Sequence, residues 1–233
     1  MQFNAPLIQG TLLRRYKRFL ADVRLADGRE VTAHCANPGA MLGVSTPGAA
    51  VWLEPNDDPK RKLKFSFKLI ALEGGHLAGI DTGVPNRIVH EALEAGAIEE
   101  LAGYAAIRPE QKYGENSRID FLLTGPGRPD AYVEVKNVHL RRTGDLAEFP
   151  DSVTTRGAKH LDELIRVHQA GHRAVMLYVL QRTDVARLAF AADLDPAYAA
   201  AQARAAEAGV EMLARRTHIS TDAIALAGPA PVA

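Results

Sequence analysis

Two carboxylates and a lysine at strand-like spacing are the strongest candidates for chemistry in this sequence. Asp120 lies in an apolar run, and Glu134 and Lys136 alternate with valines further along the chain. Side chains two residues apart on a strand point to the same face, so Glu134 and Lys136 project together. If the two runs pair, Asp120 reaches that face as well. Charged groups beside a sheet core are costly unless they are paired or bind an ion.

The repulsion between Asp120 and Glu134 requires a positive charge nearby. Lys136 supplies one, and a divalent cation would supply a stronger one. Carboxylate oxygens are the ligands that Mg²⁺ or Mn²⁺ takes. Two carboxylates, a metal ion and a lysine can orient a water molecule and stabilise charge on a phosphodiester. The spacing is also compatible with a hairpin that carries a half-exposed salt bridge, and the pattern alone leaves both interpretations open.

These residues fall in a predicted β-hairpin over residues 117–137, around which the rest of the chain is organised. Two apolar runs flank the loop 124–130, which is rich in Gly and Pro. Such a loop between two apolar runs predicts a hairpin with a connection longer than the tight two-residue kind.

The chain after residue 86 predicts a mixed sheet flanked by helices. Asn86 is a good helix N-cap, and Thr154 or Thr155 caps a second helix. The tail after residue 226 is expected to be frayed. The expected elements are a helix over 87–97, a strand over 107–113, the hairpin, a polar stretch over 139–152, a helix to 170, a buried strand over 174–180, a helix over 196–208 and a last strand over 210–215.

The helix that follows Thr154 carries a charged face. Its residues Arg156, Lys159, His160 and Glu163 follow helical spacing and share one side. If that side lies over the hairpin, it brings positive charge close to the two carboxylates. A solvated surface stripe is the alternative.

Residues 11–80 predict an all-β unit. Five short strands in about 70 residues favour a small barrel, most simply an OB-fold, which often binds single strands through aromatic and basic residues. The first strand, 11–25, contains a cluster of four basic residues, Arg14, Arg15, Lys17 and Arg18, in addition to Arg24. The remaining strands are expected at 30–35, 49–54, 64–69 and 76–81, and residues 81–86 have the composition of a linker.

Composition and charge exclude several classes of protein. The formal net charge is zero, so this is no overwhelmingly basic nucleic-acid binder, although residues 1–80 carry +4 and the remainder −4. A single cysteine, Cys35, excludes an internal disulfide framework. His34 faces the opposite side of the strand and is poorly placed to activate it. Without a membrane-spanning run or a signal peptide, we expect a cytoplasmic protein that makes no membrane contact.

Six blocks of sequence carry a resemblance to a known family. The order of helices and strands around Asp120, Glu134 and Lys136 resembles the core of PD-(D/E)xK nucleases. The whole chain resembles the sugar fermentation stimulation protein A family. The blocks are residues 16–23, 34–41, 81–86, 118–121, 134–138 and 149–161.

The resemblance implies an N-terminal OB-fold over residues 1–82, a restriction-endonuclease-like αβββαβ domain over 83–233, and DNA as partner. It implies that Asp120, Glu134 and the Val135 carbonyl bind Mg²⁺ or Mn²⁺, and that Lys136 orients the attacking water. Glu91 matches the place of an accessory acid, and Ile119 replaces the proline of the motif. The expected contacts to nucleic acid are Arg14, Arg15, Lys17, Arg18, Arg156, Lys159 and His160.

Three functions are compatible with this pattern. The first is a metal-dependent deoxyribonuclease. The second is a DNA-binding regulator of sugar (maltose) metabolism genes that keeps the nuclease fold without turnover. The third is a metal-stabilised binder of a sugar or nucleotide. An intact set of three costly charges favours the first. Strand preference, sequence preference and oligomeric state, a homodimer included, stay open.

Overall fold

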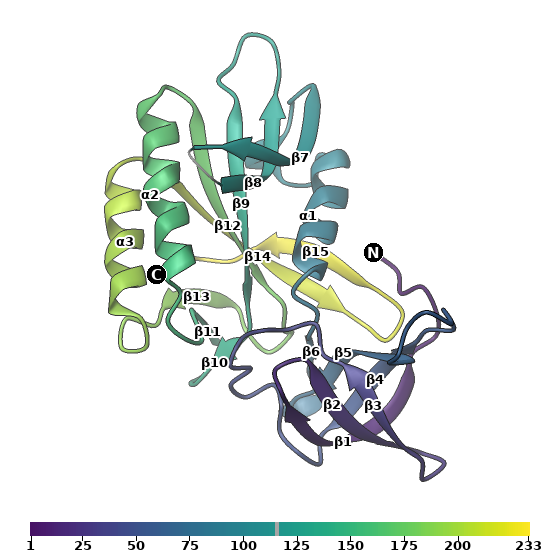
Figure 1. The fold of residues 1–233 in the computed structure, drawn as a ribbon. Helices are drawn as coiled ribbons and strands as arrows, with labels where there is room; N and C mark the ends of the chain where they lie inside the picture. Colours follow the sequence, from purple (N-terminus) through teal and green to yellow (C-terminus); the bar gives the residue numbers. More distant parts are fainter. Residues whose placement is uncertain (115–116) are drawn as a thin grey trace.

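A small β-barrel and a larger αβ domain make up the computed structural model, which describes residues 1–114 and 117–233 (Figure 1). The barrel strands follow the order β3-β2-β1-β4-β5-β6, and β3 pairs back onto β5, which closes a ring of five strands. The N-terminal domain is therefore an OB-fold, as predicted. Its strands are β1 (Ile8–Tyr16), β2 (Leu20–Leu25), β3 (Glu30–His34), β4 (Ala50–Pro55), β5 (Phe65–Ala71) and β6 (Leu77–Gly79).

The prediction of one long strand over residues 11–25 was wrong. The chain reverses between Tyr16 and Leu20, so β1 and β2 form an antiparallel hairpin. The sequence has no Gly, Pro, Asn or Asp at the reversal, and Lys17 and Arg18 adopt φ angles of 47° and 62° instead. Arg15 holds this strained turn, because its Nη2 donates to the Arg18 carbonyl at 2.9 Å. The segment predicted as the fifth barrel strand is β6, a sixth strand at the edge.

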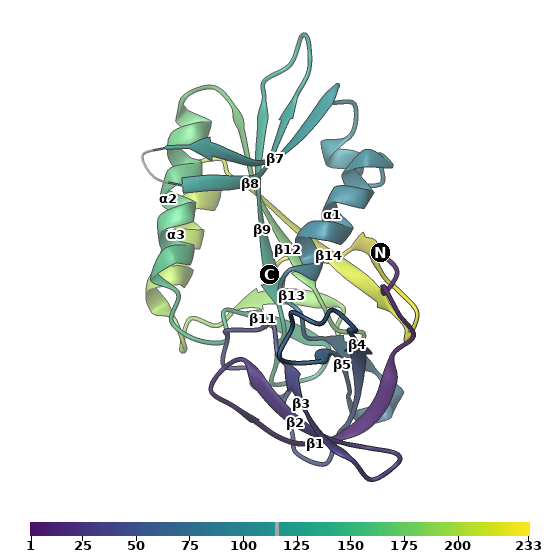
Figure 2. The ribbon, with the colours of Figure 1, turned by 45° about the vertical axis from the view of Figure 1, so that its right-hand side comes forward.

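The second domain is built on a six-stranded mixed sheet, as predicted (Figure 2). Its three central strands run parallel, and the outer pairs are antiparallel. In the order of the sheet, the strands are β15 (Ile224–Pro229), β14 (Glu211–Ile219), β12 (Arg173–Leu180), β9 (Ala131–Val138), β8 (Ser117–Thr124) and β7 (Ala106–Tyr113).

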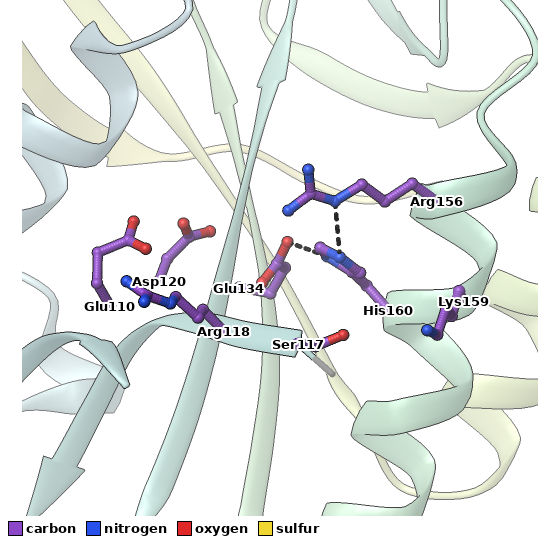
Figure 3. A pocket seen from close by; sticks show the side chains of 8 residues that line it. All are labelled: Glu110, Ser117, Arg118, Asp120, Glu134, Arg156, Lys159 and His160. Carbon is purple, nitrogen blue, oxygen red and sulfur yellow. Dashed lines mark hydrogen bonds and ion pairs between the residues drawn. The ribbon is translucent and has the colours of Figure 1, made fainter. Parts of the chain in front are cut away.

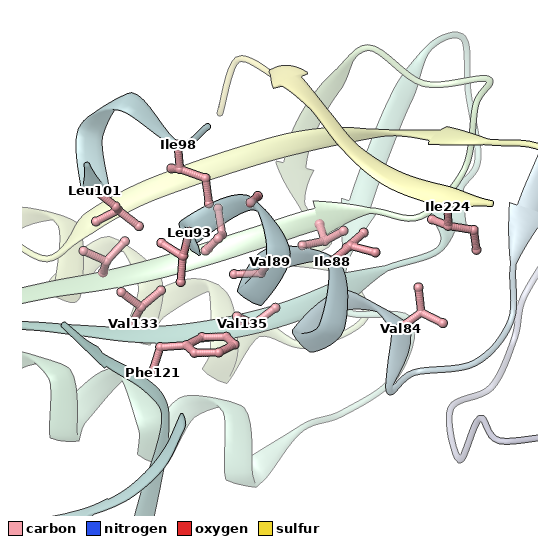
Figure 4. Close-up of a cluster of buried hydrophobic side chains, with 14 of the residues drawn as sticks. Val84, Ile88, Val89, Leu93, Ile98, Leu101, Phe121, Val133, Val135 and Ile224 are labelled. Atoms are coloured by element: carbon pink, nitrogen blue, oxygen red, sulfur yellow. The ribbon is translucent and has the colours of Figure 1, made fainter. Parts of the chain in front are cut away.

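Helices cover both faces of this sheet. On one face, α1 (Val84–Glu94) buries Ile88, Val89 and Leu93 against strand residues that include Phe121 and Val133 (Figure 4). On the other face lie α2 (Thr155–Gln169) and α3 (Pro196–Glu207), which pack on a second core. Thr154 is the N-cap of α2, as predicted, and its Oγ1 accepts from the Gly157 amide at 3.1 Å. The remaining helical segments are the short 3₁₀ turns η1 (Glu73–Gly75) and η2 (Glu99–Leu101).

Three expectations about this domain need correction. Asn86 does not cap a helix, because α1 begins at Val84 with Gly83 as its N-cap. The polar stretch after residue 138 contains two strands, which join β13 (Arg187–Phe190) in a small sheet. The tail is not frayed, since β15 pairs with β14 and the Ala233 amide donates to the Leu188 carbonyl. The strands of the small sheet are β10 (Leu140–Arg141), β11 (Leu146–Phe149) and β13 (Arg187–Phe190).

The barrel and the second domain are joined by main-chain hydrogen bonds and by a shared core. The Gly79 amide donates to the Gln181 carbonyl, and the Thr183 amide donates to the Leu77 carbonyl. Leu69 of β5 is buried in the core beneath α1. The segment predicted as a linker is fixed as well, since Asp81 accepts from Lys68 Nζ at 2.9 Å. The division of the chain after residue 82 stays a prediction.

Within the described part of the chain, no helix combines the length and apolar character needed to span a membrane.

Candidate active site

The predicted hairpin is present, and its two strands separate where the candidate residues lie. Paired residues run from Leu123 opposite Ala131 to Phe121 opposite Val133. Continuing that register would set Asp120 opposite Glu134. There the Val135 amide donates to the Asp120 carboxylate at 2.7 Å, in place of a ladder bond. A side chain thus ends the pairing, and the sheet opens at this point.

Asp120 is held by main chain and by helix α1. One carboxylate oxygen accepts from the Val135 amide, and the other accepts from Asn86 Nδ2 at 2.7 Å. Burial raises the pKa of Asp120 to about 6, with a further contribution from the charge of Glu134. The two hydrogen bonds and Lys136 offset only part of this effect. Without a cation, Asp120 is therefore a destabilised carboxylate.

Glu134 is more deeply buried, but its charge is better compensated. Its side chain is 4% exposed and accepts from Lys136 Nζ at 2.6 Å and from His160 Nδ1. Burial would raise the pKa of Glu134, but the bond from His160 and the charge of Lys136 outweigh burial and lower it. One oxygen, Oε2, has no hydrogen-bond partner in the described part of the chain.

His160 connects Glu134 to helix α2. Arg156 Nε donates to His160 Nε2 at 3.2 Å, which assigns the imidazole proton to Nδ1. Nδ1 then donates to Glu134, so the ring orientation and the carboxylate orientation are fixed together. The charged face predicted for this helix does lie over the hairpin, and its fourth member, Glu163, is buried.

A cavity of about 420 Å³ opens over the two carboxylates (Figure 3). Acidic groups lie on the strand side, whereas Arg156 and Lys159 project from α2. Lys136, whose Nζ lies 2.6 Å from Glu134, is not among the residues that line this cavity. A cavity with buried acids and surrounding cations suits an anionic ligand that is bound together with a metal ion. Its wall consists of Glu110, Ser117, Arg118, Asp120, Glu134, Arg156, Lys159 and His160.

Four residues of the site were missed from the sequence, and Ser117 in the cavity wall is one of them. Asn86 was interpreted as a helix cap, although an amide one turn into a helix can reach a neighbouring strand. Arg118 lies two residues before Asp120, and that spacing on a strand was a usable signal. Glu110 adopts a φ of 55° in β7, and nothing in its sequence context indicates this strain.

Glu91 does not lie where an accessory acid was expected. Its carboxylate forms an ion pair with the N-terminal ammonium of Met1 at 2.5 Å, and its side chain is 54% exposed. It lines neither the cavity over Asp120 nor the smaller one beside it. Glu110 is the further acid that the structure places there.

The four barrel residues predicted to contact nucleic acid have different environments. Arg14 pairs with Asp22 at 2.9 Å. Arg15 Nη2 donates to three main-chain carbonyls, those of Arg18, Asn37 and Gly39, so it braces the barrel. Lys17 and Arg18 form the exposed tip of the β1–β2 turn. The structure therefore separates a structural arginine from surface cations.

Asp120 and Glu134 fit a metal ion only with help from other ligands. Among residues 1–114 and 117–233, no three His, Cys, Asp or Glu side chains are grouped closely enough to hold a metal. Two carboxylates supplemented by a main-chain carbonyl, water and substrate oxygens are the usual set for Mg²⁺. The unpartnered Oε2 of buried Glu134 is an available ligand atom of this kind.

Comparisons with known proteins place both halves of the chain. Residues 83–223 match the family described as the sugar fermentation stimulation protein RE domain, and residues 13–80 match the SfsA N-terminal OB domain. The chain belongs to the sugar fermentation stimulation protein family. The homologue from Jannaschia sp. is 64% identical over 100% of this chain and 97% of its own length. The homologue from Dinoroseobacter shibae is 62% identical over 100% and 96%.

A solved structure of this family has the same overall architecture. Pyrococcus furiosus SfsA, determined in complex with Ca²⁺, superposes with a TM-score of 0.88 at 29% identity, covering 100% of this chain and 98% of its own. The resemblance stated from the sequence blocks is thereby confirmed, together with the fold it implied. The names of these relatives assign no catalytic reaction.

Proposed function

We propose that the chain is a divalent-metal-dependent phosphodiester hydrolase that acts on DNA. The observation that carries this proposal is Glu134, a buried carboxylate that lines a cavity with cations on its opposite wall and has one oxygen without a hydrogen-bond partner among the described residues. A group of this kind is destabilising unless a ligand completes it. The same cavity holds Asp120, whose negative charge is less well compensated than that of Glu134.

Asp120, Glu134 and the Val135 carbonyl would hold the metal ion. The complex of Pyrococcus furiosus SfsA with Ca²⁺ supports a divalent cation in this family, and we propose Mg²⁺ or Mn²⁺ as the ion used by this chain. When bound, such an ion neutralises charge that develops on the phosphodiester and helps to ionise water.

The residues of the chain have distinct parts in this proposal. Lys136 lies 2.6 Å from Glu134, where its ammonium group can orient a water molecule and stabilise developing negative charge. His160 is a positioning residue, since its Nδ1 donates to Glu134 and its ring orientation is fixed by Arg156. Arg118, Arg156 and Lys159 are placed to contact phosphate groups, with Lys17 and Arg18 as candidates for a more distant part of the strand.

Cleavage of labelled single- and double-stranded DNA with Mg²⁺, Mn²⁺ or EDTA tests the proposal. We expect cleavage that requires the metal and that is abolished by Asp120→Ala or Glu134→Ala. Because these variants keep the phosphate-binding cations, their DNA affinity should stay within a few-fold of wild type. Lys136→Ala should keep metal binding and lose roughly 10²–10⁴-fold in rate.

Glu91→Ala is the matched control, because this acid lies outside the cavity and should leave the rate unchanged. Cleavage that persists in the Asp120 and Glu134 variants would contradict the site. Metal-independent DNA binding without cleavage by the wild type would instead favour the non-catalytic regulator.

A further inference from the structure

A second, smaller cavity adjoins the candidate site on the side of helix α1. It has a volume of about 220 Å³ and shares Asp120 and Glu110 with the larger cavity. The larger cavity extends from Asp120 toward α2, whereas the smaller one extends toward α1. A ligand with a group at Asp120 can therefore place its two ends in two different environments. The rest of the smaller wall is Asn86, Arg87, His90, Pro109 and Phe121.

An aromatic stack forms one wall of the smaller cavity. His90 and Phe121 lie parallel, with ring centroids 5.6 Å apart and an interplanar angle of 7°. Phe121 is 2% exposed, so it is a fixed base beneath the imidazole. The His90 side chain is 37% exposed. The imidazole is thus backed by the core on one side and accessible on the other.

The size and lining of this cavity suit one planar ring system. Pockets for drug-sized molecules hold about 300–1,000 Å³, and this one is smaller. Its wall combines the two rings with Pro109, and Asn86 and Arg87 add polar groups. Nucleobases bind to proteins by stacking on aromatic side chains, histidine included, while their polar edges contact amides and guanidinium groups.

We propose that this cavity binds an unpaired nucleobase next to the phosphodiester at Asp120. The inference rests on the proposed function, which places a DNA backbone at the two carboxylates. A bound DNA strand would stack one base on His90, and its phosphates would continue past Arg118 and Arg156 in the larger cavity. A base within a duplex is already stacked and paired, so the preferred substrate is single-stranded DNA or a frayed end.

The test uses oligothymidylates that carry a single 2-aminopurine, whose fluorescence is quenched by stacking. The label is moved one position at a time, and binding is measured with Ca²⁺ and, separately, with EDTA. We expect quenching at a restricted set of positions in wild type. His90→Leu removes the ring and should abolish the quenching and weaken single-strand affinity by about 5- to 10-fold. His90→Phe keeps a stacking ring and should retain both.

Two controls separate stacking from other effects of His90. Glu94→Ala removes the neighbour that lies 3.8 Å from the imidazole, and it should leave quenching unchanged. Blunt duplex DNA should bind wild type and His90→Leu equally. Quenching that survives in His90→Leu, or an equal loss of duplex affinity, would overturn the proposal. The readout needs no hydrolysis, and gel analysis shows whether the oligonucleotide stays intact, so failure of the proposed reaction is seen separately.

Discussion

Asp120 and Glu134 line one cavity but differ in how their surroundings treat a negative charge. Burial and Glu134 raise the pKa of Asp120 to about 6, from an ordinary value of 3.8. For Glu134, the hydrogen bond from His160 and the charge of Lys136 outweigh burial and lower the pKa. Asp120 therefore carries most of the repulsion in the metal-free protein, while Glu134 is stabilised by its neighbours.

This asymmetry predicts opposite effects of two isosteric substitutions on the metal-free protein. The folded state binds the proton of Asp120 more tightly than the unfolded state, so ionisation of Asp120 lowers stability as pH rises from about 4 to 6, and the penalty remains above that range. Asp120→Asn removes this penalty, but the new amide loses part of the hydrogen bonding. We therefore expect a net gain in the free energy of unfolding of roughly 1–2 kcal/mol at pH 7.5 in EDTA. At pH 4 the gain should vanish.

Glu134→Gln is the contrasting variant. A lowered folded pKa contributes stability above the unfolded value of about 4.5 that is lost as pH falls through the folded pKa. The substitution leaves Lys136 and His160 without a charged acceptor, so we expect a loss of roughly 1–3 kcal/mol at pH 7.5. Denaturant unfolding in EDTA measures the free energy of unfolding of both variants. Addition of Mn²⁺ should stabilise the wild type more than it stabilises either variant. Equal destabilisation by the two substitutions would contradict the asymmetry.

The types and spacing of these residues were sufficient to predict that they meet, but not how. Alternation along β9 placed Glu134 and Lys136 on one face, and helical spacing placed His160 beside Arg156. No local rule indicates that Asn86 reaches Asp120, because that contact depends on the angle at which α1 crosses the sheet. The same holds for Glu91, whose partner is the chain terminus 90 residues away.

At the scale of elements, two predictions that depended on turn and cap residues were correct, whereas a turn without such residues was missed. The hairpin of residues 117–137 and the helix that begins after Thr154 have turn and cap residues, and both are present. The turn after Tyr16 has no such residues. It is held by Arg15, whose hydrogen bonds reach as far as Gly39. A turn fixed by tertiary contacts leaves no signature in a short window of sequence.

Substitutions that relieve the strain of this turn should raise the stability of the protein and weaken its binding to DNA. Asn and Gly enter the left-handed region more readily than Lys and Arg, so Lys17→Asn combined with Arg18→Gly should stabilise the protein by about 1 kcal/mol. If the tip contacts phosphates, the variant should also flatten the dependence of log affinity on log salt by about 1 for single-stranded DNA. Thermal melting and binding at several salt concentrations measure the two effects.

Arg15→Ala is the control for the turn. It removes the hydrogen bonds to three carbonyls, so it should lower the melting temperature and leave the salt dependence unchanged. A salt dependence that is unaffected by the double variant would place the DNA away from this turn.

At the scale of the molecule, the two domains meet in one shared apolar cluster beneath α1. Leu69 of the barrel is fully buried among residues of the second domain, and Trp52 packs against the same cluster. The N-terminal segment crosses over as well, since Met1 donates to the Ile224 carbonyl at 2.9 Å. Composition indicated a boundary near residue 82, but the cross-domain contacts depend on which face of each sheet is left uncovered, and a sequence pattern does not show that.

The shared core predicts that the two domains unfold together. Leu69→Ala leaves a cavity at the joint and should destabilise the protein by about 2–5 kcal/mol. Trp52 is the only tryptophan, so its fluorescence reports on the joint. Far-ultraviolet circular dichroism reports on the helices, which in the described part of the chain lie outside the barrel apart from η1. For wild type and variant alike, we expect the two signals to change at the same denaturant concentration, with the midpoint of the variant lowered.

Val31→Ala, at a half-buried position of the barrel core remote from the joint, is the comparison. Separate transitions, or a Leu69→Ala variant in which only the fluorescence change moves, would show that each domain is stable alone and that the contacts at Leu69 contribute little.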